Sequence, residues 1–108
     1  MARLIYAAQA LGDFERLTDF LLTSDPKAAT ATVGLIEEAI TLLKRHPLIG
    51  RPVEHGLREL VISRGRTGYL ALYDFDEVQD VVAILAIRHQ REAGYGMQDE
   101  DDTFTPAA

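Results

Sequence analysis

Cationic and polar side chains are concentrated in residues 88–95, which directly follow a fully apolar stretch. The segment reads Arg88-His89-Gln90-Arg91-Glu92-Ala93-Gly94-Tyr95. Polar groups placed where a buried strand leaves the core indicate a surface that contacts a ligand or partner. A histidine exchanges protons near neutral pH and arginines hold phosphates through paired hydrogen bonds, so activation of an RNA 2′-hydroxyl is a chemistry open to this segment. The alternative is that His89 and Arg91 cap the sheet and pair with Glu92 or Asp80.

Other reactive classes find little support in the sequence. There is no cysteine, which excludes thiolate chemistry and disulfides and is compatible with a reducing cytoplasm. Gly65 and Gly68 are not followed by the Lys-Ser/Thr pair of a phosphate-binding loop. The three histidines are isolated from one another, so we expect no metal site and no cofactor.

Charge is distributed unevenly along the chain, although the net charge is −6. Four of the acids fall at 99–102, whereas residues 44–66 hold six bases against Glu54 and Glu59. This middle segment predicts contact with an anionic partner such as RNA, DNA or an acidic protein segment, the alternative being ordinary solvated arginines. Its bases are Lys44, Arg45, Arg51, Arg58, Arg64 and Arg66.

Two helices should position these groups. After a short strand at residues 3–6, apolar residues recur three or four apart from position 7 to about 24, with the acids of this segment mostly on other faces. Asp25 can cap a second helix whose first turn accepts Pro26, and His46-Pro47 ends that helix. The apolar face of residues 26–46 is broad, with Leu35 and Leu42 widening a central stripe.

Three strands are expected after the helices, at residues 57–63, 69–75 and 78–87, the last two joined by an acidic turn at 74–77. The last strand is apolar enough to be buried on both sides. The order β-α-α-β-β-β predicts an α+β fold, a two-helix hairpin packed on a twisted, mainly antiparallel sheet. We expect one domain over residues 1–95 and a disordered acidic tail over 96–108, the tail alternatively folding over the basic middle.

Several of these features together resemble the RelE/ParE toxin superfamily. They are the β-α-α-β-β-β order, the Pro47-x-x-Gly50-Arg51 loop, Leu57-Arg58-Glu59-Leu60, the strand Thr67-Gly68-Tyr69-Leu70-Ala71-Leu72-Tyr73, and the ending His89-x-Arg91. The resemblance covers residues 3–95. It implies the toxin of a type II toxin–antitoxin system, restrained by a cognate antitoxin, ParD-like or similar, in a hetero-oligomer.

The resemblance leaves two activities open. RelE-like members cut mRNA in the ribosome without a metal, and His89 and Tyr95 match their basic residue and the tyrosine six positions later. However, Leu70 stands where those nucleases carry an arginine, and no lysine follows Lys44. Since metal-free cleavage must stabilise a pentacoordinate phosphorane with positive charge, these departures favour the ParE-like branch, a non-enzymatic growth inhibitor that poisons DNA gyrase.

The alternatives remain a ribosome-dependent mRNA endonuclease and a non-toxic module that only binds an antitoxin. A nuclease would use Arg58, His89, Arg91 and Tyr95. For Arg58 the other interpretation is an exposed strand residue paired with Glu37 or Glu38. The surface expected to contact the target or the antitoxin comprises Arg51, Arg58, Arg64, Arg66, Arg88, His89, Arg91 and Tyr95.

An antitoxin is also expected from the broad face of residues 26–46, because one small sheet would leave part of it for an amphipathic helix of a partner. DNA gyrase is the expected target, with the ribosome and mRNA as the alternative. No secretion signal or membrane span is recognised, so a cytoplasmic protein is expected, without membrane association. We expect no direct sequence-specific DNA binding by this chain.

Overall fold

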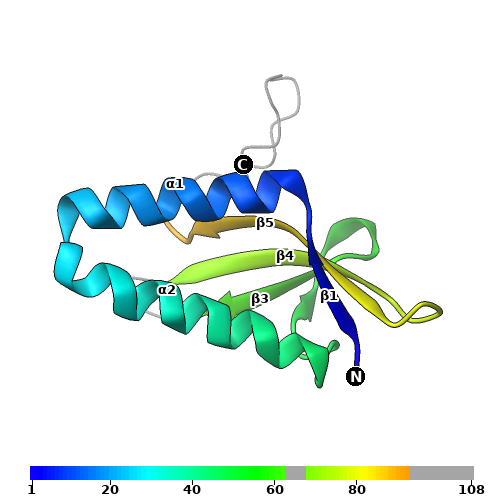
Figure 1. Ribbon diagram of the computed structural model, residues 1–108. Coiled ribbons are helices and arrows are strands. Elements are labelled where there is room, and N and C mark those ends of the chain that lie inside the picture. Colours follow the sequence, from blue (N-terminus) through cyan, green and yellow to red (C-terminus); the bar gives the residue numbers. More distant parts are fainter. Residues whose placement is uncertain (63–67, 93–108) are drawn as a thin grey trace.

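The computed structural model describes residues 1–62 and 68–92, in which two helices cover one face of a five-stranded sheet (Figure 1). Helix α1 spans Ala8–Ser24 and α2 spans Pro26–Thr41. Asp25 forms the turn between them, and its carboxylate accepts the backbone N–H of Ala28 at 3.3 Å. The predicted capping by Asp25, with Pro26 in the first turn of α2, is therefore confirmed.

Helix α2 ends earlier than residue 46, the predicted end. It gives way to a 3-10 turn, η1, over Leu42–Lys44, and the carbonyl of Leu42 accepts the N–H groups of both Arg45 and His46. The tighter turn satisfies carbonyl groups that the helix leaves unpaired at its end. Pro47 then follows, and a proline disfavours the helical conformation for the residue before it.

The sheet has the strand order β1-β5-β4-β3-β2, and the predicted mainly antiparallel sheet is confirmed. Its strands are β1 (Arg3–Tyr6), β2 (Arg51–Pro52), β3 (Arg58–Ile62), β4 (Tyr69–Asp76) and β5 (Val81–His89). β1 pairs in parallel with β5, from which it is separated in the chain by the helical hairpin and by strands β2, β3 and β4. The two-residue strand β2, followed by the 3-10 turn η2 (Glu54–Gly56), was not predicted.

The last strand starts later than predicted. Val78 lies in a turn over residues 77–80 and is 94% exposed. The carboxylate of Asp76 accepts the N–H of Gln79 at 3.1 Å, and Asp80 adopts a left-handed φ of 59°. Aspartate favours turns at both of these positions. The predicted acidic turn at 74–77 was therefore placed too early, since β4 continues through Asp76 and the turn covers residues 77–80.

The hydrophobic core lies between the helices and the sheet, where α1 packs on β5 and α2 on β3. On β5, Val82, Ile84 and Ile87 are fully buried against the helices. Ala83 and Leu85 are only half-buried, so the prediction that this strand is buried on both sides was wrong for part of its length. Within residues 1–62 and 68–92, no helix is long and apolar enough to cross a membrane.

Candidate functional site

The loop after α2 is held by one buried tyrosine. The hydroxyl of Tyr73 donates to the carbonyl of Pro47 at 2.7 Å and accepts the N–H of Gly50 at 2.9 Å. Tyr73 is fully buried, and desolvation raises its pKa above the ordinary value; the bond from Gly50 and the charge of Arg58 oppose this shift. The Pro47-x-x-Gly50 motif and the tyrosine strand motif are therefore two halves of one contact.

Gly50 must lack a side chain for this contact to form. A Cβ atom there would lie 2.6 Å from both Cε1 and the hydroxyl of Tyr73 and 3.0 Å from the carbonyl of Glu59. Distances this short require the backbone or the tyrosine ring to move. The glycine of the motif thus permits the close approach of loop and strand.

Arg58 supports the same loop from β3. Its Nη1 donates to the carbonyl of Gly50 at 2.7 Å and to that of Leu48 at 3.2 Å. The suggested pairing of Arg58 with Glu37 or Glu38 is not what the structure shows. A guanidinium that bonds two carbonyls of one loop acts as a fixed support for that loop.

Arg51 pairs with a buried carboxylate. Nε of Arg51 donates to Oε1 of Glu59 at 2.8 Å, and Nη2 reaches the same oxygen. Glu59 is 7% exposed, whereas the Arg51 side chain is 61% exposed. The pair joins β2 to β3, where these two residues are in direct register.

His89 ends β5 with its ring fixed from two sides. The ring lies edge-on to Tyr69, with centroids 5.1 Å apart, and Nδ1 accepts the N–H of Arg91 at 3.1 Å. An imidazole nitrogen that accepts a hydrogen bond carries no proton, so the neutral ring bears its proton on Nε2. The turn over residues 89–92 therefore orients a proton-bearing nitrogen.

Glu92 ties this turn to α1. One carboxylate oxygen accepts the backbone N–H of His89 at 3.0 Å, and the other accepts Nη1 of Arg16 at 2.5 Å. Arg88 closes the turn, since its Nη1 donates to the carbonyls of His89, Gln90 and Glu92. Of the alternative in which His89 and Arg91 pair with Glu92 or Asp80, the structure shows the bond from the His89 backbone to Glu92, whereas Asp80 faces the N-terminal amine at 3.9 Å.

Asp13 was expected on an outer face of the first helix, and this was wrong. It is 6% exposed, and its carboxylate accepts the N–H of Ile87 at 2.9 Å and Nε2 of Gln9 at 3.2 Å. β1 ends its pairing at Tyr6, so the carboxylate satisfies an N–H of β5 that lies beyond the end of β1. Burial raises the pKa of Asp13 against the opposing effects of the Ile87 N–H and Arg16.

The predicted catalytic residues do not converge in the described part of the chain. Residues in direct register share a face of the sheet; Arg58 pairs with Tyr73 and His89 with Tyr69, both on the helix-covered side. Ile62 on β3 lies in register with Tyr69 and so with His89, two strand spacings away on β5. Arg58 lies four residues from Ile62 along β3. Strand geometry then separates the Cα atoms of Arg58 and His89 by about 16 Å.

The opposite face of the sheet carries Arg51, Glu59, Leu70 and Arg88, as their registers show. Leu70 lies between Val61 and Arg88 and is 5% exposed. The structure thus divides the predicted site between two faces. Arg91 is exposed beside His89, while Arg64, Arg66, Tyr95 and the tail at 96–108 lie outside the described residues.

The sequence did not predict the internal hydrogen bonds that engage the arginine side chains. An acid three positions after Ala10 and four before Leu17, both on the packed face of α1, was an available sign that Asp13 is buried. The roles of Tyr73 and Glu92 had no local sign, because their partners are distant in sequence. Among residues 1–62 and 68–92, no group of three or more histidine, aspartate or glutamate side chains could hold a metal ion.

Solved structures with this arrangement come from toxin–antitoxin systems. The chromosomal ParDE system of P. aeruginosa matches with a TM-score of 0.67 and 24% identity, over 82% of this chain and 96% of that one. The toxin–antitoxin complex RelBE2 of Mycobacterium tuberculosis matches with a TM-score of 0.55 and 26% identity, with the same coverage. The fold is therefore that of the RelE/ParE toxins.

Sequence comparisons define the family. Residues 4–94 match the model described as ParE toxin of type II toxin-antitoxin system, parDE. Toxin RelE3 of Caulobacter vibrioides is 34% identical over 78% of this chain and 89% of its own length, and Toxin RelE1 of the same organism is 35% identical over 64% and 74%. The chain belongs to the ParE toxin family of type II toxin–antitoxin systems. The toxin–antitoxin origin of the similar structures also supports an antitoxin as its partner.

Proposed function

We propose that this toxin inhibits growth by poisoning DNA gyrase and catalyses no reaction of its own. The observation that carries the proposal is that the side chains of Arg58 and His89 are each held by neighbours of their own, on backbone positions whose Cα atoms lie about 16 Å apart by strand geometry. Acid–base cleavage of RNA requires its proton-transfer groups within hydrogen-bond reach of one phosphodiester. Arg58 is also engaged by the loop carbonyls of Leu48 and Gly50, which it would have to release to bind a phosphate.

Leu70 supports the same conclusion. It occupies the position of a nuclease arginine, and it is packed between Val61 and Arg88 on the face away from the helices. An aliphatic side chain gives no stabilisation to the negative charge of a phosphorane. Among the described residues, Arg88 is the cation that pairs with this position across the sheet, and its Nη1 bonds the carbonyls of His89, Gln90 and Glu92.

A ribosome-dependent endoribonuclease is the second candidate, favoured by the orientation of His89. Its ring is fixed by Tyr69 and by the N–H of Arg91, which leaves Nε2 as the proton donor of the neutral ring. The N–H of a fixed histidine beside an exposed arginine can donate a hydrogen bond to a phosphate. The Caulobacter vibrioides relatives are called RelE3 and RelE1, which keeps this candidate in place.

Two assays on the purified chain separate the candidates. The first measures supercoiling and cleaved-complex formation by DNA gyrase, and the second measures codon-phased cleavage of mRNA on ribosomes. We expect inhibited supercoiling, accumulated cleaved complexes and intact mRNA. His89→Ala is the diagnostic variant, and Gln79→Ala, in the exposed turn at the other end of β5, is its matched control.

Intact supercoiling at excess toxin, together with mRNA cuts that disappear in His89→Ala but not in Gln79→Ala, would refute gyrase poisoning in favour of the nuclease. A third possibility is a module that only binds its antitoxin. In that case induction of the chain alone would leave growth unaffected, and neither assay would respond.

A further inference from the structure

The last part of β5 has a neighbouring strand on one side only. On one edge β1 ends its pairing at Tyr6, whereas β5 runs on to His89. On the other edge β4 follows β5 to its end, where the carbonyl of Gly68 accepts the N–H of Gln90 at 2.9 Å. Other groups must therefore satisfy the open edge of residues 85–89.

Two carboxylates satisfy this open edge, and both are connected to α1. Asp13 accepts the N–H of Ile87 at 2.9 Å, directly from the helix. Two residues along the strand, the N–H of His89 donates to Glu92 at 3.0 Å. The other oxygen of Glu92 accepts Nη1 of Arg16, again on α1, at 2.5 Å. Since N–H groups two residues apart in a strand point to the same side, both bonds lie on the edge that β1 leaves open.

Arg16 joins the two carboxylates into one network. Besides its short bond to Glu92, its Nη2 lies 3.4 Å from the second oxygen of that residue and 3.7 Å from Oδ1 of Asp13. A guanidinium has its N–H donors in a planar fork, so it can bond carboxylates on two sides at once. Arg16 is also the one base in the sequence of α1, beside the acids Asp13, Glu15 and Asp19. Within that helix no second cation can take its place.

The exposure of this pair indicates a role in orientation more than in overall stability. The side chains of Arg16 and Glu92 are 49% and 37% exposed. An ion pair so accessible to water contributes little to the free energy of unfolding. The same pair nevertheless fixes the backbone at His89, whose Nδ1 accepts the N–H of the exposed Arg91. It can therefore orient the turn over residues 89–92, although the fold would persist without it.

We propose that Arg16 is a positioning residue for the surface through which the toxin contacts its target. It acts through Glu92, and so sets how His89 and Arg91 are placed relative to the sheet. This inference rests on the proposed function only in that the turn contacts a target, and it holds for DNA gyrase and for the ribosome alike. A lysine at position 16 carries a point charge on a flexible stem, so it should keep the charge but hold Glu92 less firmly.

Growth inhibition on induction of the full chain is the first test. Arg16→Ala should raise the amount of toxin that halves the growth rate by about fivefold or more, and Arg16→Lys by about twofold. Arg3→Ala is the matched control and should leave that amount unchanged, because Arg3 is an exposed base that pairs with Val81 at the opposite end of β5. Because Arg16 acts through Glu92, Arg16→Ala should have no further effect in a Glu92→Ala background.

Hydrogen exchange and urea unfolding separate orientation from folding. In Arg16→Ala, exchange of the His89 amide should accelerate about tenfold, because the turn loses its link to α1. Exchange of the amide of Val82, which is fully buried on β5, should keep its wild-type rate. The urea midpoint should also stay close to the wild-type value.

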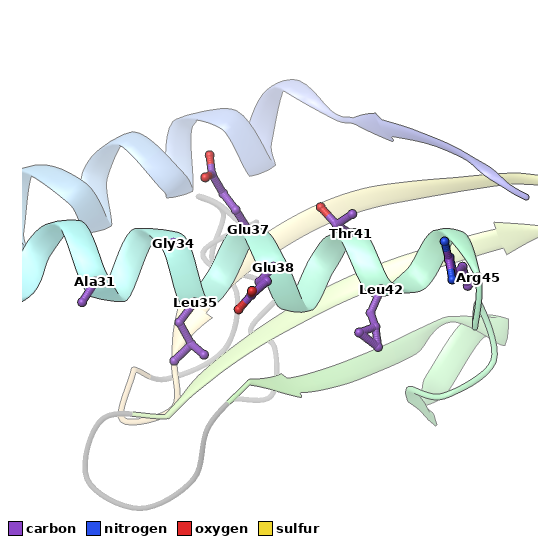
Figure 2. Close-up of a pocket in the computed structure, with 8 residues that line it drawn as sticks. All are labelled: Ala31, Gly34, Leu35, Glu37, Glu38, Thr41, Leu42 and Arg45. Atoms are coloured by element: carbon purple, nitrogen blue, oxygen red, sulfur yellow. The ribbon is translucent and has the colours of Figure 1, made fainter.

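Antitoxin binding provides a further control on a separate surface. A shallow groove on the outer side of α2, the α2 groove, is lined by the half-exposed Leu35 and Leu42 (Figure 2). It belongs to the helix face on which an antitoxin is expected, whereas the network of Arg16 joins α1 to β5. The protein encoded immediately upstream should therefore co-purify with the Arg16→Ala chain as it does with the wild type.

Several results would overturn the proposal. Growth inhibition by Arg16→Ala at the wild-type level would do so, as would equal losses in Arg16→Ala and Arg3→Ala. A further loss on combining Arg16→Ala with Glu92→Ala would show that Arg16 does not act through Glu92. A lower urea midpoint or lost antitoxin binding in Arg16→Ala would show a disturbed fold instead of a misplaced turn. Failure of gyrase poisoning is seen separately, because the wild-type chain would then leave supercoiling intact while Arg16→Ala still weakens growth inhibition.

Discussion

Replacing Tyr73 by phenylalanine should destabilise the protein through the loss of one oxygen atom. The hydroxyl bonds the carbonyl of Pro47 and the N–H of Gly50, and both lie in the loop that leads to β2. Phenylalanine keeps the ring, and with it the packing of a fully buried side chain. The variant therefore isolates the two hydrogen bonds.

The expected cost follows from the surroundings of the two partners. Gly50 is buried, so its N–H loses its partner without gaining water, which costs about 2 kcal/mol. The Pro47 residue is half-buried and its carbonyl can bond water, so its loss adds about 1 kcal/mol or less. A total of about 2 to 3 kcal/mol lowers the Tm of a domain of this size by at least about 10 °C.

Urea unfolding at pH 7 measures this cost, and a second experiment tests its cause. Burial raises the pKa of Tyr73 above 10.0, so the folded protein holds the phenolic proton more tightly than the unfolded chain does. The contribution of Tyr73 to the free energy of unfolding is fully present below pH 10 and is lost as the pH rises through the folded pKa. The phenylalanine variant has no phenolic proton and should not show this loss. A change below about 0.5 kcal/mol at pH 7 would refute the assigned role of the hydroxyl.

Three further substitutions test the contacts around the sheet. Burial raises the pKa of Asp13 above 3.8, so the free energy of unfolding of the wild type should fall as the pH rises from about 4 through the folded pKa. Asp13→Asn should remove this pH dependence when unfolding is measured with urea. The same pH dependence in the variant would contradict the role of Asp13. Arg51→Ala leaves the buried Glu59 carboxylate without its guanidinium and should lower the free energy of unfolding by about 1 to 2 kcal/mol. Adding Glu59→Gln should recover most of this loss. Additive effects of the two substitutions in a double-mutant cycle would exclude the coupling. Glu92→Ala breaks an ion pair with Arg16 in which both side chains are over one-third exposed, so the free energy of unfolding should change by less than about 1 kcal/mol. Amide hydrogen exchange at the end of β5 should accelerate about tenfold. Exchange at the wild-type rate would show that the pair does not hold the turn.

The elements that the sequence predicted correctly are those specified by neighbouring residues. Asp25-Pro26 marks the start of α2 by local capping chemistry, and apolar spacing identifies both helices. The parallel pairing of β1 with β5 and the two-residue strand β2 depend on partners distant in the chain. The acids at 74–76 look like a turn by composition, yet Asp74 and Phe75 pair with Ala83 and Val82. Pairing with β5 therefore makes this segment extended, although its composition favours a turn.

For the site, the sequence shows which cations are present but not which contacts already occupy them. Arg58 supports the loop after α2, Arg51 neutralises a buried carboxylate, and Arg88 bonds carbonyls at the end of β5. Each would have to exchange these hydrogen bonds for those of a phosphate. Spacing along the chain gave the right residue types for phosphate chemistry, whereas the alternation of faces along strands placed them on opposite sides of the sheet.

This use of the cations bears on how the toxin recognises other molecules. Binding to RNA or DNA depends on lysines and arginines that neutralise phosphates. This chain has a net charge of −6, and Arg51, Arg58 and Arg88 are engaged in contacts of their own, which disfavours such binding. The apolar α2 groove and the turn at His89 and Arg91 offer protein-binding chemistry instead. Under the proposed function, we expect the toxin to contact its antitoxin on one surface and its enzyme target on another. Separate effects of Leu42→Asp on antitoxin binding and of His89→Ala on growth inhibition would demonstrate this division, whereas loss of both activities in either variant would show that the two proteins share one surface.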